Sequence, residues 1–179
     1  QIGPNTSNPL YGIYAETCNS GQENDHNSII GCNIFDYFIA NQTPAGIYIK
    51  NYNTDYTIQG NSVYQTSSRT MSATNAVYGI YIESVNGNNF TIEDNYIGGS
   101  ATECSGTAWT QTGSIGHKFA GIRITCEITT PSNIHGNIIR NIDLTSTSYG
   151  ATGQPLAAGI IVLKGSVNIG TDAGNTIGD

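Results

Sequence analysis

Two rows of chemically versatile side chains, one aromatic and one charged, recur at fixed distances from five glycines. The residues two positions after these glycines are Tyr14, Tyr48, Tyr81, Arg123 and Ile161. The residues four positions after them are Glu16, Lys50, Glu83, Thr125 and Leu163. If the strands that carry them stack about 4.8 Å apart, the tyrosines and Arg123 form a strip against which sugar rings can stack. The competing interpretation is that rows of similar residues only stabilise the wall of a sheet.

A long loop between Gly98 and Ala120 is the second candidate for ligand binding. It holds the single tryptophan, Trp109, together with His117 and Lys118. Long loops on a rigid scaffold often carry binding residues, so we interpret Trp109 as a candidate carbohydrate contact. The alternative is that this loop only covers one flank of the fold.

The four cysteines are even in number and allow three pairings. Cys18 and Cys32 bracket an insertion in the first repeat, while Cys104 lies in the longest loop and Cys126 follows the next strand. We therefore expect the disulfides Cys18–Cys32 and Cys104–Cys126, which would indicate an oxidising compartment. Four unpaired thiols are the alternative. No C-x-x-C motif occurs and the histidines are scattered, so we expect no metal site.

The elements that must position these residues repeat five times along the chain. Each repeat contains a glycine that opens a short apolar strand, and these glycines are Gly12, Gly46, Gly79, Gly121 and Gly159. Each also contains an asparagine inside a second apolar run, and these asparagines are Asn33, Asn61, Asn95, Asn137 and Asn175. The distance from glycine to asparagine is 15 or 16 residues in all repeats but the first, whereas the remaining segment varies freely. A fixed wall with tolerant loops is typical of a solenoid.

The asparagine marks a bend in each repeat. Apolar residues flank it at an odd separation, as Ile92 and Ile97 flank Asn95, so a bend is needed for both to face the core. Asparagine tolerates the left-handed backbone region, and we therefore place the bend at the asparagine itself. Stacked coil on coil, the asparagines are expected to form a ladder of amide hydrogen bonds along the axis.

These repeats resemble right-handed parallel β-helices of the pectate-lyase-like type, as found in bacterial secreted or surface proteins. Such proteins have three sheets per coil and an asparagine ladder at a short turn. The resemblance spans the chain from about Ile2 to Ile177. The predicted fold class is all-β: a right-handed parallel β-helix solenoid of about five coils with an asparagine ladder, in a single domain over residues 1–179. An antiparallel β-sandwich is the competing fold, but the period of 33 to 42 residues favours the β-helix.

The resemblance also raises an enzymatic alternative. Similar enzymes cleave acidic polysaccharides with a Lys or Arg base beside calcium-bound carboxylates, or with clustered aspartates. Lys50 and Arg123 lie on the sheet where such enzymes carry their catalytic residues. However, two coils, about 9–10 Å, separate them, and no aspartate lies on the same face. Asn53, Thr54 and Asp55 are similar to part of a pectin hydrolase motif whose remaining residues are missing. We therefore expect a structural or adhesive stalk or filament segment, with a polysaccharide lyase or glycoside hydrolase as the alternative, and assign no catalytic residue.

Composition limits the partners. Only 11% of the 179 residues are charged and the net charge is −7 with six Lys and Arg, which argues against a nucleic-acid partner. No apolar stretch approaches the length of a membrane span, and no cofactor is expected. We expect an extracellular or cell-surface location, with polysaccharide as a candidate partner.

The two ends of the sequence occupy equivalent points of the repeat, near Gly3 and Gly178. Bare terminal coils expose strand edges and apolar core. We therefore expect either further coils of the same chain or head-to-tail stacking of copies.

Overall fold

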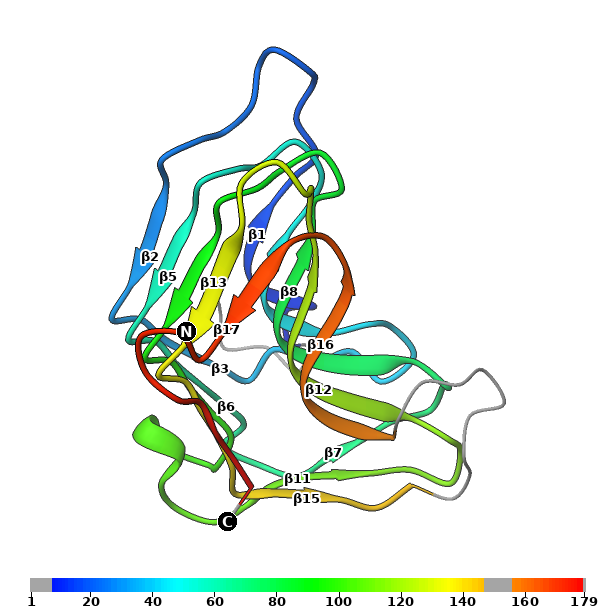
Figure 1. Cartoon of the computed structure of the whole chain (residues 1–179). Helices are drawn as coiled ribbons and strands as arrows, with labels where there is room; N and C mark the ends of the chain where they lie inside the picture. Colours follow the sequence, from blue (N-terminus) through cyan, green and yellow to red (C-terminus); the bar gives the residue numbers. More distant parts are fainter. Residues whose placement is uncertain (1–7, 147–155, 179) are drawn as a thin grey trace.

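The chain winds through its sheets in a fixed order, so that each turn adds one strand to the side of the previous turn (Figure 1). The computed structural model describes residues 8–146 and 156–178. Within these ranges the strands form four sheets in which every pairing is parallel, and η1 (Thr102–Cys104) is the one helical segment. The fold is a parallel β-helix, which confirms the predicted class. No helix in the described ranges is long and apolar enough to cross a membrane.

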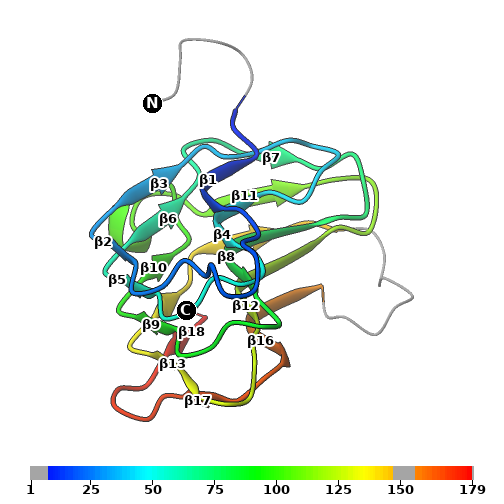
Figure 2. The same ribbon diagram turned by 90° about the horizontal axis from the view of Figure 1, so that it is seen from above.

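Sheets 1 and 2 run the length of the stack. Sheet 1 consists of β1 (Tyr11–Ala15), β4 (Ala45–Ile49), β8 (Ala76–Glu83), β12 (Lys118–Thr125) and β16 (Ala157–Lys164). Sheet 2 consists of β2 (Ser28–Ile30), β5 (Thr57–Gln59), β9 (Thr91–Glu93), β13 (Ser132–His135) and β17 (Val167–Ile169). Seen from above, the strands of sheet 1 follow one another in chain order from β1 to β16 (Figure 2).

Sheet 3 also has one strand in every coil, whereas sheet 4 has strands in the three middle coils alone within the described ranges. Sheet 3 consists of β3 (Asn33–Phe35), β6 (Ser62–Tyr64), β10 (Tyr96–Ile97), β14 (Ile138–Ile139) and β18 (Thr176–Ile177). Sheet 4 consists of β7 (Arg69–Thr70), β11 (Trp109–Thr112) and β15 (Ile142–Leu144). The expectation of three sheets per coil misses sheet 4, because its strands lie in the segment whose length differs from repeat to repeat and which therefore shows no common spacing.

Isoleucines from sheets 1, 2 and 3 fill the interior. The fully buried ones include Ile47, Ile49, Ile58, Ile80, Ile82, Ile92, Ile97, Ile122, Ile124 and Ile134. They stack in register from coil to coil, as Ile47, Ile80 and Ile122 do in sheet 1. Each buried isoleucine contributes about 1.5–3 kcal/mol, so the repeated apolar positions are what hold the coil together.

The repeat glycines are needed where sheets 1 and 3 meet inside the coil. A Cβ on Gly79 would lie 2.6 Å from the Gly121 carbonyl oxygen and 2.6 Å from Cγ2 of Ile97. The other repeat glycines show the same contact with the sheet 3 residue of their own coil, for example Gly46 with Val63. The recurring glycine therefore reflects close approach of backbone and core side chain rather than a turn.

The asparagine ladder is present at the corner between sheets 2 and 3. The side-chain oxygen of Asn95 accepts hydrogen bonds from Asn61 at its backbone nitrogen (3.0 Å) and at Nδ2 (2.9 Å). Asn95 makes the same pair of bonds to Asn137, and Asn137 makes it to Asn175. Nδ2 of Asn95 also donates to the Ile58 carbonyl oxygen at 2.8 Å. The ladder therefore joins four successive coils.

Asn33 is not part of this ladder, contrary to the expectation. Asn33 pairs in register with Ser62, so Cys32 occupies the position equivalent to Asn61. Accordingly, the backbone nitrogen of Cys32 donates to Oδ1 of Asn61 at 2.9 Å. The two adjacent isoleucines of β2 explain the error: Ile29, not Ile30, is the inward-facing partner of Ile58, and a slip of one residue moves a side chain to the opposite face.

The bend itself precedes the asparagine by one residue. The residues with positive φ at this corner are Gly31 (64°), Gly60 (62°), Asp94 (55°) and Gly136 (66°). Each stands directly before a ladder position, so the left-handed residue aims the next side chain into the corner. The expectation that asparagine itself supplies the bend is therefore wrong, and glycine supplies it in three of these four turns.

The expected disulfides are absent, because all four cysteines lie in the described ranges and no disulfide joins any two of them. Cys18 follows β1 and its thiol donates to the Glu16 carbonyl, whereas Cys32 follows β2 and donates to the Ile30 carbonyl. The second pair is divided in the same way, since the Cys104 thiol contacts the Ile138 carbonyl beside sheet 3 and the Cys126 thiol contacts the Ser166 carbonyl before sheet 2. Each expected pair sits at different corners of the coil.

Candidate functional site

The outer face of sheet 1 carries a continuous group of tyrosine rings together with one arginine that stacks on them. We call this group the tyrosine band, and it consists of Tyr11, Tyr14, Tyr48, Tyr78, Tyr81 and Arg123. The row predicted from the sequence is confirmed, because Tyr14, Tyr48, Tyr81, Arg123 and Ile161 are partners in register across sheet 1. Strands supply this alignment because parallel pairing places equivalent residues of successive coils beside one another. The band therefore spans four coils.

The rings of the band stack mainly on one another. The centroids of Tyr48 and Tyr81 are 4.5 Å apart with the rings 5° from parallel, and those of Tyr14 and Tyr48 are 5.5 Å apart. Arg123 covers the other side, with its guanidinium carbon 4.6 Å from the Tyr81 centroid. Tyr81 is consequently only 7% exposed, whereas Tyr14 at the first coil is 43% exposed. The ring faces inside the band are occupied, and the free ring surface lies at its first coil and along ring edges.

Two of these aromatic residues were missed by the sequence analysis. Tyr11 lies 5.0 Å from Tyr14 and Tyr78 lies 4.6 Å from Tyr81, measured between ring centroids. The signal was available, because both residues directly precede a repeat glycine.

A row of charges borders the band. Nζ of Lys50 lies 2.6 Å from a Glu16 carboxylate oxygen, and the Tyr14 hydroxyl donates to the other oxygen at 2.6 Å. The Tyr48 hydroxyl donates to Glu83 of the next coil. Hydrogen bonds from Lys50, Tyr14 and the Thr17 amide lower the pKa of Glu16 to about 2. The charged groups are thus bound to the band and to one another.

The predicted row of charges changes at the last coil. Thr125 pairs with Lys164 rather than with Leu163, because the register of β12 and β16 shifts after Ile124. Leu163 is instead half exposed at this irregularity. The row therefore ends on a cation.

The geometry does not support base catalysis by Lys50. Its hydrogen bond to Glu16 raises the pKa of Lys50, whereas an amine that acts as a base at neutral pH needs a lowered pKa. Burial, followed by the hydrogen bond to Glu83, raises the pKa of Tyr48 far above its usual range, so this phenol stays neutral and donates. Burial raises the pKa of Tyr81 in the same way. These groups are suited to holding a ligand rather than to proton abstraction.

The pectin hydrolase-like run is also structural. Asn53 is fully buried, and its Nδ2 donates to the carbonyl oxygens of Glu16 and Lys50 at 2.9 Å each. Asp55 lies away from the tyrosine band, where it pairs with His26 and accepts a hydrogen bond from Asn89. In the described ranges, no three His, Cys, Asp or Glu side chains cluster as they would around a metal ion.

Trp109 is a core residue, which corrects its assignment as a carbohydrate contact. Its side chain is 1% exposed and packs edge-on against Tyr37 and Phe119, with centroids 6.0 and 5.3 Å away. Strand β11 alternates, so Trp109 and Gln111 face inward while Thr110 and Thr112 face outward. The segment interpreted as a long loop therefore contains a strand of sheet 4 whose inward side chains belong to the core. His117, which follows this strand, is also buried.

A hollow of about 300 Å³ adjoins the tyrosine band at the third and fourth coils. Its polar lining consists of Thr43, Thr74, Asn75, Tyr78, Lys118 and Arg123. Tyr78 and Arg123 belong to the band, so the hollow and the band form one surface. The volume of the hollow lies at the lower end of the range for small-molecule sites. Its polar lining combines the Tyr78 ring, hydroxyls, an amide and two cations, and contains no carboxylate.

No family model, curated protein or solved structure matches the chain. The fold assignment therefore rests on the parallel stacking and the asparagine ladder themselves. The narrower resemblance to the pectate-lyase-like type receives no support from homology, and function has to be argued from the tyrosine band and its hollow.

Proposed function

We propose that the protein is an extracellular structural β-helix, a stalk or filament segment, that contacts carbohydrate through the tyrosine band and the adjoining hollow. The observation that carries the carbohydrate part is the convergence of Tyr78, Arg123 and Lys118 with three neutral hydrogen-bonding residues around one hollow. Saccharides present hydroxyls together with an apolar ring face, and this lining offers partners for both. An anionic substituent on the sugar would find two cations there.

The rigid-scaffold part is supported by the stack itself. Buried isoleucines and the asparagine ladder continue from coil to coil, so adjacent coils hold one another in register. Because no disulfide joins the cysteines, they give no support for an oxidising compartment, and the extracellular location rests on the carbohydrate proposal. The lyase or hydrolase alternative has no observation in its favour, since Lys50 is bound to Glu16 and Asp55 lies away from the band.

The test compares two exposed aromatic residues of the first coil. Tyr14 (43% exposed) belongs to the band, whereas Phe35 (38% exposed) stacks on Tyr64 in sheet 3, away from the band. On an array of neutral, carboxylated and sulfated glycans we expect Tyr14→Ala to weaken retention about threefold to tenfold, as loss of one aromatic contact does. Phe35→Ala should leave retention unchanged.

Arg123→Met provides the second arm at the hollow. The methionine keeps apolar contact with Tyr81 but removes the charge and the donors, so retention of anionic glycans should fall most. Circular dichroism melting controls for folding. If the wild-type protein is retained on no glycan, or if Phe35→Ala weakens retention as much as Tyr14→Ala, the carbohydrate proposal is wrong.

A further inference from the structure

A change in side-chain size along one row of sheet 1 accounts for the hollow beside the tyrosine band. The residues directly before the repeat glycines are partners in register, and in chain order they are Tyr11, Ala45, Tyr78, Ala120 and Ala158. After Tyr78 the row continues with two alanines, so a methyl group stands where a ring would fill the space. Tyr78 and Ala120 both line the hollow of about 300 Å³.

The tyrosine band ends at this hollow. Beyond Arg123, its row continues with Ile161, and Leu163 of the same strand is half exposed. Both side chains line the hollow, and neither offers a ring face or a hydrogen-bonding group. A volume at the lower end of the small-molecule range has room for one sugar residue rather than for a run of them. A sugar chain that follows the band would therefore place a terminal residue here.

The charge in the hollow is positive. Its lining contains Lys118 and Arg123 and no carboxylate. The guanidinium carbon of Arg123 lies 4.6 and 5.6 Å from the centroids of two tyrosine rings of the band. Among the described residues, no carboxylate forms an ion pair with Arg123. Arg123 is thus fixed in place by rings, and its charge is available to an anionic group of a ligand.

Carboxylates border the rest of the band. Glu16 at the first coil and Glu83 at the third accept hydrogen bonds from the hydroxyls of Tyr14 and Tyr48. The cation between them, Lys50, pairs with Glu16. A chain with an acid group on every residue would meet these carboxylates and be repelled, whereas a neutral chain would not. Charge complementarity therefore favours a neutral chain that carries one acidic residue, placed in the hollow.

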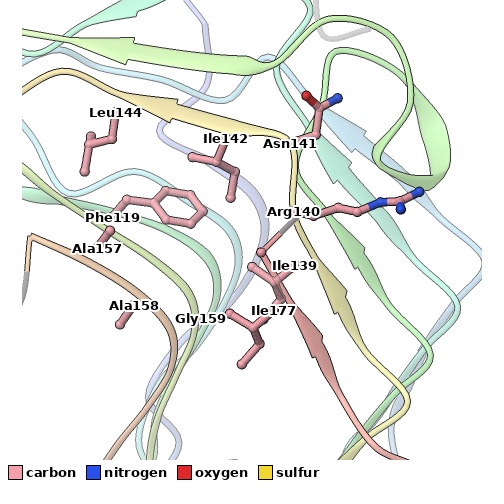
Figure 3. A pocket seen from close by; sticks show the side chains of 11 residues that line it. Phe119, Ile139, Arg140, Asn141, Ile142, Leu144, Ala157, Ala158, Gly159 and Ile177 are labelled. Atoms are coloured by element: carbon pink, nitrogen blue, oxygen red, sulfur yellow. The ribbon is translucent and has the colours of Figure 1, made fainter.

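A second cavity, of about 320 Å³, does not suit such a ligand. Its apolar lining includes Phe119, Ile139, Ile142, Leu144 and Ile177. Figure 3 shows the side chains of Arg140 and Asn141 directed away from these apolar residues. Nδ2 of Asn141 donates instead to the Cys104 carbonyl oxygen at 3.0 Å. A charged sugar placed there would lose its hydration without gaining polar partners, so of these two cavities the hollow beside the band is the candidate.

We propose that the hollow binds the terminal residue of an otherwise neutral glycan, and that this residue is an acidic sugar at the free, non-reducing end. Glycans are attached to proteins and lipids through the reducing end, so the non-reducing end is the one presented to a partner. The carboxylate faces the two cations of the lining, and the remaining sugars follow the ring edges of the band toward Tyr14. The inference rests on the proposed carbohydrate contact and names the class of glycan that this contact selects.

Isothermal titration calorimetry with a matched set of tetrasaccharides tests the proposal. The set comprises a neutral chain, the same chain with one uronic acid at the non-reducing end, the same chain with that uronic acid inside, and a chain of four uronic acids. Free uronic acid is the fifth ligand. We expect the acid-ended chain to bind about tenfold more tightly than the neutral chain, as a charge-assisted hydrogen bond permits. The other two acidic chains should bind no more tightly than the neutral one, and free uronic acid should bind more weakly than the acid-ended chain.

Three variants separate the two charges of the band. Arg123→Met should abolish the preference for the acid-ended chain over the neutral chain. Arg140→Met, which removes one cation at sheet 3 away from the band, is the matched control and should keep this preference. Glu83→Gln retains an acceptor for the Tyr48 hydroxyl and should improve binding of the chain of four uronic acids while leaving the acid-ended chain unchanged. Circular dichroism melting controls for folding.

The outcomes distinguish this inference from the proposed function. Equal binding of the neutral and acid-ended chains by the wild-type protein overturns the inference and leaves the carbohydrate contact standing. Tightest binding of the chain of four uronic acids, or equal binding of the internal and terminal acids, overturns selection of a chain end. Free uronic acid that binds as tightly as the acid-ended chain would make the hollow a site for a small acid, which also overturns it. Binding of no ligand in the set overturns the carbohydrate contact itself.

Discussion

Two rows of polar side chains run along the axis of this stack, one inside a corner and one on an outer face. In the asparagine ladder, Asn61, Asn95 and Asn137 are fully buried and repeat the same hydrogen bonds to the next coil. In the tyrosine band, exposure falls from 43% at Tyr14 to 7% at Tyr81, and the hydrogen bonds do not repeat: the Tyr14 hydroxyl donates to Glu16 of its own coil, whereas the Tyr48 hydroxyl donates to Glu83 of the next coil.

The difference lies in what each row must satisfy. At the buried corner, the asparagine oxygen accepts a hydrogen bond from the backbone amide of the ladder residue in the preceding coil, and Nδ2 donates to a buried carbonyl oxygen. Both groups need a partner there, so one residue type recurs. On the outer face the side chains of successive coils pack against one another but do not have to satisfy buried backbone groups. The row therefore changes from tyrosine to Arg123 and then to Ile161. The inner row therefore identifies the fold, while the outer row is free to carry function.

Asn95→Ala should have the largest effect on this comparison. It removes the acceptor of the Asn61 backbone amide and of one Asn61 Nδ2 hydrogen, together with the donor to the Ile58 carbonyl oxygen, whereas Asn61 Nδ2 keeps its bond to the Ile29 carbonyl oxygen. We expect a loss of about 3 kcal/mol in the free energy of unfolding, measured by chemical denaturation. Equivalent changes at Asn61 and Asn137 should cost a similar amount.

Asn33→Ala is the matched control, since Asn33 lies one residue outside the ladder and is exposed. Its change should stay within about 0.5 kcal/mol, as for other surface substitutions. A large loss at Asn33 together with a small loss at Asn95 would contradict the register of the first coil.

Most of the fold could be predicted because its determinants are local and repeated. The glycine marks the close approach of sheets 1 and 3, and the isoleucines mark the core in every coil. Sheet 4 could not be predicted, since β7, β11 and β15 share neither length nor sequence. The first coil was misread by one residue because Ile29 and Ile30 both fit the apolar position.

The candidate site was only partly accessible from the sequence. The row from Tyr14 to Arg123 follows from constant spacing to the glycines, and the structure places it as expected. The spacing of the repeats did not show that Trp109 faces inward. Its segment was interpreted as a loop, so the alternation of inward and outward side chains in strand β11 was not considered. The hollow depends on Thr43, Thr74 and Asn75, which approach sheet 1 from connections of variable length.

Cys32→Asn should extend the ladder by one coil and sharpen the comparison. Cys32 already stands at the ladder position and its backbone amide donates to Oδ1 of Asn61. An asparagine there can add a bond from its own Nδ2 to the same oxygen, which we expect to stabilise the protein by about 1 kcal/mol in thermal or chemical unfolding. Cys32→Ala controls for loss of the thiol. Equal stability of the two variants would show that the first coil cannot join the ladder.

The smallest effect concerns the charge row that borders the band. Lys50→Met removes the first of the three hydrogen bonds that lower the pKa of Glu16 to about 2, so this pKa should rise toward the ordinary value near 4.5 while Tyr14 and Thr17 still hold it partly down. Because the folded-state pKa is depressed, the stabilisation is present above about pH 4.5 and is lost as the pH falls toward 2. Glu16 is fully exposed, so the effect on unfolding should be slight and weaken with salt, unlike the loss at Asn95. NMR titration of the Glu16 carboxyl measures the change, with Lys118→Met as control. An unchanged Glu16 pKa in Lys50→Met would mean that the tyrosine hydroxyl and the amide alone set it, and that the row does not couple neighbouring coils.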